Sequence, residues 1–161
     1  MKERGLFYEN KIRTRVCGLI IKNDKILLVK HLLKGNPFYA SPGGGVEFGE
    51  SIDTALKREI KEETDIEAVD ASFRFITEYI KPPLHAIELF YLISQWNGEA
   101  KTGSDPESID IGEPLLIKDA NWFSMEEIKL MDLKEVHHIF HNCNNLRDIL
   151  QLSGHIPYTT F

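Results

Sequence analysis

Strand-like segments dominate the hydrophobic pattern of this 161-residue chain. Four of them are rich in apolar and β-branched residues over lengths typical of strands. They cover residues 14–21, 25–30, 71–80 and 85–95. Asn23 and Asp24 separate the first two, and both residue types tolerate the backbone of a tight turn. The pattern therefore predicts a β-hairpin, a second pair of strands and a short extended piece at 38–40.

Helices are predicted in three places. Residues 51–64 form the first, because Ser51 is a good N-cap and apolar positions recur at helical spacing behind it. Ser124, followed three positions later by Glu127, forms a capping box that predicts a second helix. The apolar periodicity of residues 133–150 predicts a final helix.

The order of these elements indicates the fold class. Strands and helices are mixed along the chain, and a long helix follows the first hairpin and the extended piece, so we expect an α/β protein built as an α/β/α sandwich with a mixed sheet. The segment 98–114 is rich in turn and acidic residues and predicts a long loop. We see no linker, repeat or low-complexity segment, so residues 1–161 are expected to form a single domain.

The helix predicted at 51–64 has an unusual distribution of charge. At about 100° per residue, its apolar face in the first half continues in the second half as Glu59, Glu62 and Glu63. Three carboxylates on a core-facing stripe repel one another and resist desolvation unless something positive lies among them. A hard divalent cation is the simplest answer. The alternative is a solvated helix with Arg/Lys–Glu pairs, but its acidic face would then oppose the apolar stripe.

Gly44 is followed after five residues by Glu50, and after seven more by Arg58-Glu59-Ile60-Lys61-Glu62-Glu63. This spacing resembles the Nudix box of the Nudix hydrolases. One variable position after the last glutamate, the family box ends with a glycine and an apolar residue, where this chain has Asp65 and Ile66. Asp is among the few other residues that tolerate a left-handed backbone, so we expect a local cost in stability and no loss of catalysis.

The resemblance implies a set of site residues. Glu59, Glu62 and Glu63, with the Gly44 carbonyl oxygen, would bind Mg²⁺ or Mn²⁺, and Gly43, Gly44 and Gly45 would form a loop that approaches the substrate phosphates. The implied catalytic set also includes Arg58, which would hold Glu62, and Glu50, which would act behind the ligands or through a bridging water.

A general base is harder to place from sequence. In some members of the resembled family, a glutamate from a loop late in the chain performs this role or binds a further metal ion. Glu113, between Gly112 and Pro114, is the first candidate, with Glu107 and Glu99 behind it. Each of the three also fits an ordinary solvent-exposed loop acid.

The composition and net charge of the chain restrict its binding partners and its location in the cell. The net charge of −6 disfavours long nucleic acid as a partner, so a small-molecule nucleotide is expected. No run of about eighteen apolar residues exists to span a membrane, and residues 1–5 lack the apolar stretch of a signal peptide. Cys17 and Cys143 are the only cysteines, which suits a reducing cytoplasm. The resemblance also implies that a homodimer is common.

Two other groups of residues suggest binding sites. His137 and His141 have metal-ligand spacing on the predicted final helix, with His138 and Cys143 nearby. No partner acid lies in a matching motif, so core packing explains them better than zinc. Several aromatic residues are candidates to stack on a base, although aromatic residues in strands are more often core. They are Phe38, Tyr39, Phe90, Tyr91, Trp122 and Phe123.

Taken with the resemblance, the sequence implies Mg²⁺-dependent hydrolysis of the pyrophosphate bond in a nucleoside diphosphate derivative. The candidate substrates are a nucleoside triphosphate, ADP-ribose or another nucleotide sugar, and a dinucleoside polyphosphate. The alternative is a catalytically weak, Nudix-like nucleotide-binding or regulatory module. Isomerisation of a prenyl diphosphate, which uses a related fold, is disfavoured by the close match to the hydrolase box.

Overall fold

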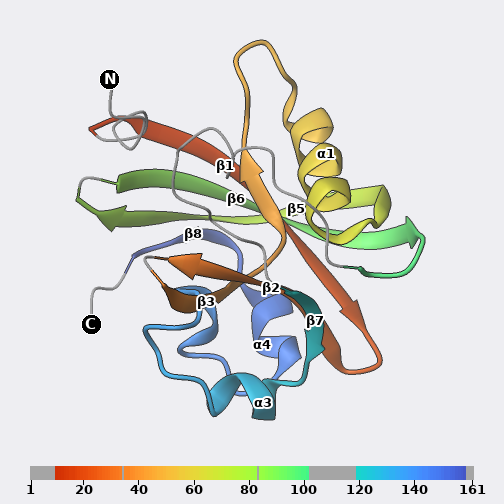
Figure 1. Ribbon diagram of the computed structural model, residues 1–161, viewed down its shortest axis with the longest axis vertical. Coiled ribbons are helices and arrows are strands. Elements are labelled where there is room, and N and C mark those ends of the chain that lie inside the picture. Colours follow the sequence, from red (N-terminus) through yellow and green to blue (C-terminus); the bar gives the residue numbers. More distant parts are fainter. Residues whose placement is uncertain (1–9, 34, 83, 102–118, 159–161) are drawn as a thin grey trace.

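The computed structural model describes residues 10–33, 35–82, 84–101 and 119–158. Its centre is a mixed sheet (Figure 1). The strands are β1 (Ile12–Lys22), β2 (Lys25–Leu33), β3 (Asn36–Ala40), β4 (Gly43–Gly45), β5 (Glu67–Lys81), β6 (Leu84–Asn97), β7 (Asp119–Phe123) and β8 (Gly154–Ile156). The helical elements are α1 (Ile52–Thr64), α3 (Met125–Lys129), the 3₁₀ helix η2 (His138–Phe140) and α4 (Leu146–Gln151).

Sheet order brings distant parts of the chain together. The main path runs β3-β2-β1-β6-β5-β8, with β4 paired to β1 and β7 paired to β2. The β1–β6 and β5–β8 pairs are parallel and the others are antiparallel. Both predicted strand pairs, β1–β2 and β5–β6, are confirmed. Asn23 and Asp24 have φ of 52° and 57°, as the tight turn between β1 and β2 requires.

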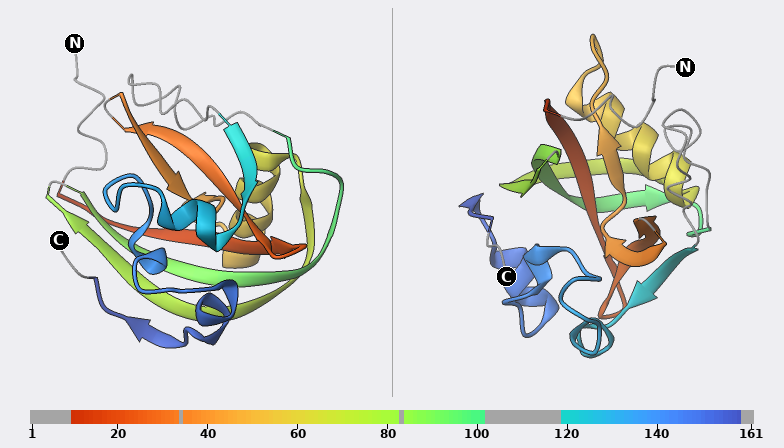
Figure 2. Two further views of the ribbon diagram at one scale, coloured as in Figure 1. Left: turned by 90° about the horizontal axis from the view of Figure 1, so that it is seen from below. Right: turned by 60° about the vertical axis from the view of Figure 1, so that its left-hand side comes forward.

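Alternating side chains give the sheet two apolar faces. On one face, Val16, Ile20 and Leu27 pack against Leu56 and Ile60 of α1. The other face packs against α3, η2 and α4, and its buried side chains include Cys17, Leu19, Ile26, Leu28, Phe75 and Phe90. Helices therefore cover both faces, as Figures 1 and 2 show, and the predicted α/β/α sandwich is confirmed.

The final helix predicted at 133–150 is wrong. Val136 forms a bridge with Tyr39, His138–Phe140 is a single 3₁₀ turn, and α4 begins only after Asn145. One cause is local, because the Asn145 side chain accepts from the backbone N–H of Asp148 and starts a new helix. This asparagine-to-aspartate spacing is a capping signal that was readable in the sequence.

The glycines at 43–45 also differ from the expected loop. They form the short strand β4, in which Gly43, Gly44 and Gly45 pair with Cys17, Val16 and Arg15 of β1. A Cβ atom on Gly43 would lie 2.0 Å from the carbonyl oxygen of Val16. Only glycine fits there, so the triplet lets two backbones approach closely and lies buried beside α1.

Candidate active site

Both ends of α1 are fixed by the residues that the sequence indicated. Ser51 is the N-cap and accepts a hydrogen bond from the Thr54 N–H at 3.1 Å, with Asp53 in the first turn. Asp65 is the C-cap and has the left-handed backbone expected of a glycine, with φ of 62°. Its N–H donates to the carbonyl oxygen of Lys61. The helix therefore has defined ends, and the orientation of its acidic face is set.

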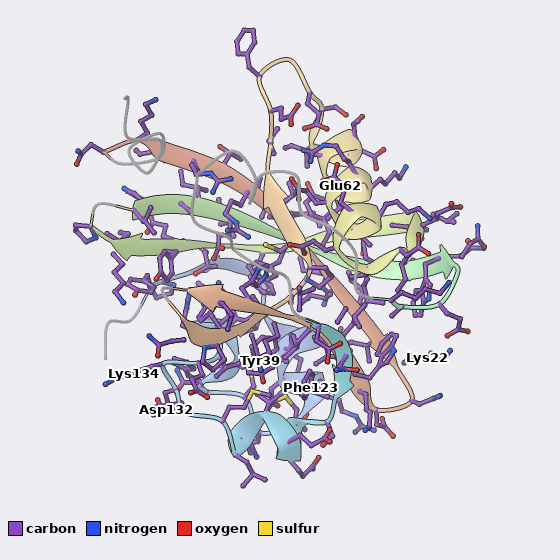
Figure 3. The ribbon with its side chains drawn as sticks, viewed as in Figure 1. Lys22, Tyr39, Glu62, Phe123, Asp132 and Lys134 are labelled. Atoms are coloured by element: carbon purple, nitrogen blue, oxygen red, sulfur yellow. The ribbon has the colours of Figure 1, made fainter. Side chains whose placement is uncertain are left out.

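The glutamates of α1 differ in burial. Glu59 and Glu63 are each only 2% exposed, whereas Glu62 is half-buried. Figure 3 shows Glu62 on α1, on the opposite face of the sheet from Tyr39 and Phe123, which pack with the other core. Burying two carboxylates of one helix is costly without compensating contacts. Their partners therefore decide what this face can do.

The backbone of β4 lies directly against these carboxylates. The Gly43 N–H donates to Glu63 Oε2 at 2.8 Å. A Cβ atom on Gly44 would lie 2.3 Å from both Cδ and Oε2 of Glu59. The sheet and the helix are thus in contact through glycine backbone on one side and buried carboxylates on the other. Oxygen atoms of both kinds are the ligands that Mg²⁺ prefers.

Arg58 links the start of the box to its acidic end. Its Nε and Nη2 donate to the two oxygens of Glu50 at 2.8 and 2.9 Å, a bidentate pair. Its Nη1 donates to Glu59 at 2.7 Å and to Glu62 at 3.3 Å, and its Nη2 also donates to the Gly45 carbonyl at 3.0 Å. The hydrogen bonds from Arg58 hold the pKa of Glu50 down, at about 2. Arg58 contacts Glu62 as expected, but its strongest geometry is with Glu50.

The pKa values of two side chains near the buried glutamates, His31 and Cys17, are shifted. His31 lies 3.9 Å from Glu63, yet burial and then the charge of Arg15 lower its pKa to about 4, so it is neutral at pH 7. Burial raises the pKa of the Cys17 thiol, and the negative charges of Glu88, Glu63 and Glu59 raise it further. The positive charge of Arg15 opposes these carboxylates and lowers the pKa of the thiol.

The donor set fits a hard divalent cation chemically, since it combines clustered carboxylates with backbone carbonyl oxygens. Within the described residues, however, no three His, Cys, Asp or Glu side chains converge on one point as a formed metal site. Arg58 is bonded to Glu59 and Glu62 in this structure. Because it donates to one oxygen of each carboxylate, Glu59 Oε1 and Glu62 Oε2, a cation bound here would share both carboxylates with Arg58. The same finding gives no support to zinc at His137 and His141, whose side chains bond instead to Glu88 and to the Val136 carbonyl oxygen.

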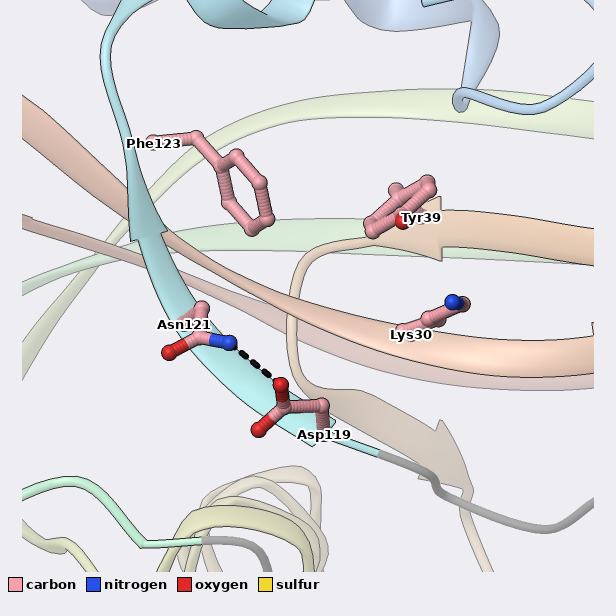
Figure 4. Close-up of a pocket in the computed structure, with 5 residues that line it drawn as sticks. All are labelled: Lys30, Tyr39, Asp119, Asn121 and Phe123. Atoms are coloured by element: carbon pink, nitrogen blue, oxygen red, sulfur yellow. Dashed lines mark hydrogen bonds between the residues drawn. The ribbon is translucent and has the colours of Figure 1, made fainter.

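The aromatic candidates are mostly structural. Phe90 stacks on Phe75 in the core, with ring centroids 4.7 Å apart. Tyr39 and Phe123 meet edge to face at 5.5 Å and line a small pocket with Lys30, Asp119 and Asn121 (Figure 4). Its volume of about 90 Å³ is below the roughly 300 Å³ of small ligand pockets. This pocket is too small for a nucleotide as it stands.

The candidate bases fall in different parts of the chain. Glu113 and Glu107 lie outside the described residues. Glu99 is described, at an exposed position after β6. Glu50 is held by Arg58, close to the acidic face of α1.

A family comparison agrees with this arrangement. The model of the NUDIX domain matches residues 11–142, which include β4, α1 and the whole acidic face. The chain belongs to the Nudix hydrolase family. Nudix proteins with curated names are similar to it over much of its length. An ADP-ribose pyrophosphatase of Methanocaldococcus jannaschii is 39% identical over 100 residues, which are 59% of this chain and 58% of that protein.

A second Nudix relative matches more completely. An 8-oxo-dGTP diphosphatase of Haemophilus influenzae is 34% identical over 137 residues, covering 80% of this chain and 97% of that protein. An NAD-capped RNA hydrolase, NudC, of Salmonella heidelberg is 24% identical over 124 residues, and the chain spans only 44% of its length. Two of these three relatives thus extend well beyond the part that this chain matches.

Solved structures show the same Nudix fold. A MutT NUDIX hydrolase from Burkholderia pseudomallei has a TM-score of 0.63 at 22% identity and covers 89% of this chain and 99% of its own. A MutT protein from Methanosarcina mazei Go1 has a TM-score of 0.63 at 19% identity, covering 89% and 93%. Across the described segments, every helix lacks either the length or the apolar character needed to cross a lipid bilayer.

Proposed function

We propose that this Nudix protein is a pyrophosphohydrolase that uses Mg²⁺, or Mn²⁺ in its place, to cleave a nucleoside diphosphate derivative. The observation that supports this most directly is the burial of Glu59 and Glu63 against the glycine backbone of β4. A protein that only bound a nucleotide would gain nothing from two desolvated carboxylates on one helix.

The residues for the proposed reaction are those of the box. Glu59, Glu62, Glu63 and the Gly44 carbonyl would hold the cation. When bound, a divalent cation neutralises phosphate charge and lowers the pKa of water, which favours attack at phosphorus. Arg58 would keep Glu50 and the glutamates of α1 in place through its five-donor guanidinium.

The net reaction is balanced by one water molecule. Its oxygen forms a bond to one phosphorus of the P–O–P bridge, and the bridging oxygen leaves with the other phosphate. A carboxylate accepts the proton that the water loses. Glu113 is the proposed acceptor, with Glu50 next, because a base must come within about 2.6–3.2 Å of the water or act through another water.

The names of the relatives suggest the substrate classes to test. They specify ADP-ribose, 8-oxo-dGTP and NAD-capped RNA. We propose a small nucleoside diphosphate derivative, with ADP-ribose and nucleoside triphosphates first and dinucleoside polyphosphates after them. The low cysteine content and the composition support a cytoplasmic location.

A substrate panel tests the proposal. The purified chain is incubated with each nucleotide derivative and Mg²⁺ or Mn²⁺, with and without a chelator, and products are separated by chromatography. Reaction in ¹⁸O-water identifies the attacked phosphorus. We expect turnover that a chelator abolishes and that falls by orders of magnitude in Glu63→Gln. The matched control is Glu67→Gln, an exposed glutamate three residues beyond α1 that pairs with Lys61.

The outcomes separate the two candidate functions. Turnover that survives chelation or the Glu63→Gln substitution would contradict the proposal. Tight nucleotide binding without turnover across the panel would favour the alternative, a catalytically weak binding or regulatory module.

A further inference from the structure

A polar cluster lies outside the Nudix box, on the face of the sheet opposite the hydrophobic contacts of α1. It consists of Arg15 on β1, Glu88 on β6 and His137 just before η2. Glu88 is 5% exposed and His137 is 4% exposed. Buried charges of this kind are expensive and need a structural or functional reason.

Within this cluster, His137 and Glu88 are joined by a short hydrogen bond. His137 Nε2 lies 2.6 Å from Glu88 Oε2, while His137 Nδ1 accepts a hydrogen bond from the Ile139 N–H at 3.3 Å. The Nε2 atom therefore carries the proton and donates a hydrogen bond to Glu88. The ring also packs edge to face on Phe90, with centroids 5.6 Å apart. Burial opposes the charged form of Glu88, but His137 and Arg15 together lower its pKa to about 2. Glu88 is thus an anion at neutral pH.

Arg15 connects this anion to the glycine strand. In the sheet it lies between Glu88, its parallel partner on β6, and Gly45, its antiparallel partner on β4. Its Nε is 3.7 Å from Glu88 Oε1, and its Nη2 donates to the Gly43 carbonyl oxygen at 3.2 Å. That carbonyl belongs to the peptide unit joining Gly43 to Gly44. The guanidinium therefore holds the orientation of the peptide that leads into Gly44.

Gly43 also contacts α1, because its N–H donates to Glu63 Oε2 at 2.8 Å. We propose that Arg15, anchored by Glu88, is a positioning residue that fixes the Gly43–Gly44 peptide and through it the carboxylate of Glu63. His137 ties this anchor to the segment before η2. The inference rests on the proposed metal-dependent function, since Glu63 is one of its proposed metal ligands.

Substitution of Arg15 removes both its positive charge and its contact with the Gly43 carbonyl oxygen. These two losses predict opposite effects on the binding of a divalent cation. Arg15 is itself a cation near the site, so its removal by charge alone would strengthen binding of a divalent ion. If positioning dominates, Arg15→Met weakens Mn²⁺ binding, by roughly 10-fold as for other groups that orient metal ligands. A residue that only supports the fold would change the unfolding temperature and leave the affinity alone.

The experiment combines two readouts on the full chain. Mn²⁺ affinity is measured by electron paramagnetic resonance or calorimetry, and exchange of the Gly43 amide hydrogen is measured by NMR on metal-free protein. Arg15→Met is expected to raise the Mn²⁺ dissociation constant about 10-fold and to speed exchange at Gly43, with partial rescue in Arg15→Lys. Arg13→Met, two residues earlier on β1, is the matched control.

Glu88→Gln tests the anchor, with Glu78→Gln as its control, because the Glu78 carboxylate lies 4.0 Å from His85 and 3.5 Å from His155. If Glu88 acts through Arg15, adding Glu88→Gln to Arg15→Met causes no further change in Gly43 exchange. Unchanged or tighter Mn²⁺ binding in Arg15→Met, or unchanged Gly43 exchange, would overturn the inference and leave the proposed function standing. Failure of the parent chain to bind Mn²⁺ would overturn both.

Discussion

Gly44 lies so close to Glu59 that no side chain fits between them: a Cβ atom there would be 2.3 Å from the Glu59 carboxylate. Gly44→Ala must therefore displace either β4 or that carboxylate. We expect Mn²⁺ affinity and hydrolysis each to fall by at least about 10-fold, on the scale of other displaced metal ligands. Titration calorimetry and initial rates measure the two effects.

The result for Gly44→Ala is informative only if the fold persists. Circular dichroism and the unfolding temperature of metal-free protein provide that control. A variant that binds Mn²⁺ as tightly as the parent would show that Glu59 and Gly44 do not act together at the metal.

Arg58 is expected to be more than a source of positive charge. Arg58→Lys keeps the charge but removes the bidentate contact with Glu50 and the simultaneous contact with Glu59. Loss of one or two charge-assisted hydrogen bonds predicts a fall in kcat/KM of roughly 10–100-fold. Lys57→Met, which removes only the exposed pair with Asp53, should change the rate little. Equal rates for Arg58→Lys and the parent would mean that charge alone is sufficient.

Local signals explain what the sequence predicted well. Ser51 and Asp65 mark the ends of α1 by cap chemistry, and Asn23-Asp24 marks the first hairpin by turn chemistry. Each of these depends on a few neighbouring residues. The acidic face of α1 likewise follows from helical spacing within one segment.

Non-local pairing explains what the sequence did not predict. Arg15 and Glu88 meet because β1 and β6 are parallel neighbours in one register, and no local pattern specifies that register. The bridge between Tyr39 and Val136 similarly interrupts a segment whose apolar spacing alone favoured a long helix. Glycines at 43–45 form a strand for the same reason, since their partner is β1.

Asp65 offers a test of the departure from the family box. Its left-handed φ of 62° favours glycine, but its carboxylate also pairs with Lys61 at 2.8 Å. These effects oppose each other, so Asp65→Gly should leave the unfolding temperature within about 2–4 °C of the parent. Asp65→Ala loses the ion pair and retains the strain, and should unfold at a lower temperature than either. Activity should barely change in both variants, and a large gain in Asp65→Gly would instead indicate an electrostatic effect of Asp65 on the metal ligands.

Glu113 is tested by its effect on rate and affinity together. If it accepts the proton from the attacking water, Glu113→Gln should lower kcat by about 10²–10⁴-fold with little change in KM, because a base acts in the transition state. The acidic limb of the pH–rate profile should disappear with it. Glu107→Gln and Glu99→Gln are the comparison variants. A Glu113→Gln enzyme that is as fast as the parent would move the role to Glu50 or another carboxylate.

His138 is expected to make stability depend on pH. Its Nε2 lies 2.8 Å from the Thr77 hydroxyl, which donates to the Ile156 carbonyl oxygen, so the imidazole donates to Thr77. Burial lowers the pKa of His138 from 6.5 to about 4, helped by the neighbouring His137 and His141. Glu88 acts in the opposite direction, and the Tyr158 ring packs edge to face on the imidazole.

The sign of the effect follows from proton binding. Between pH 6.5 and about 4 the unfolded chain binds a proton at His138 that the folded chain does not, so the free energy of unfolding falls as the pH falls through this window. After allowance for the partial exposure of the ring, the loss attributable to His138 is on the order of 1 kcal/mol. His138→Gln retains a donor for Thr77 and cannot titrate. Urea unfolding of the parent and of this variant at pH 7.5, 6, 5 and 4.5 isolates the contribution of His138 to the free energy of unfolding, because His31 and Glu88 titrate in both proteins. The parent should lose more stability than His138→Gln on acidification, and two parallel curves would show that His138 is not held neutral by its surroundings.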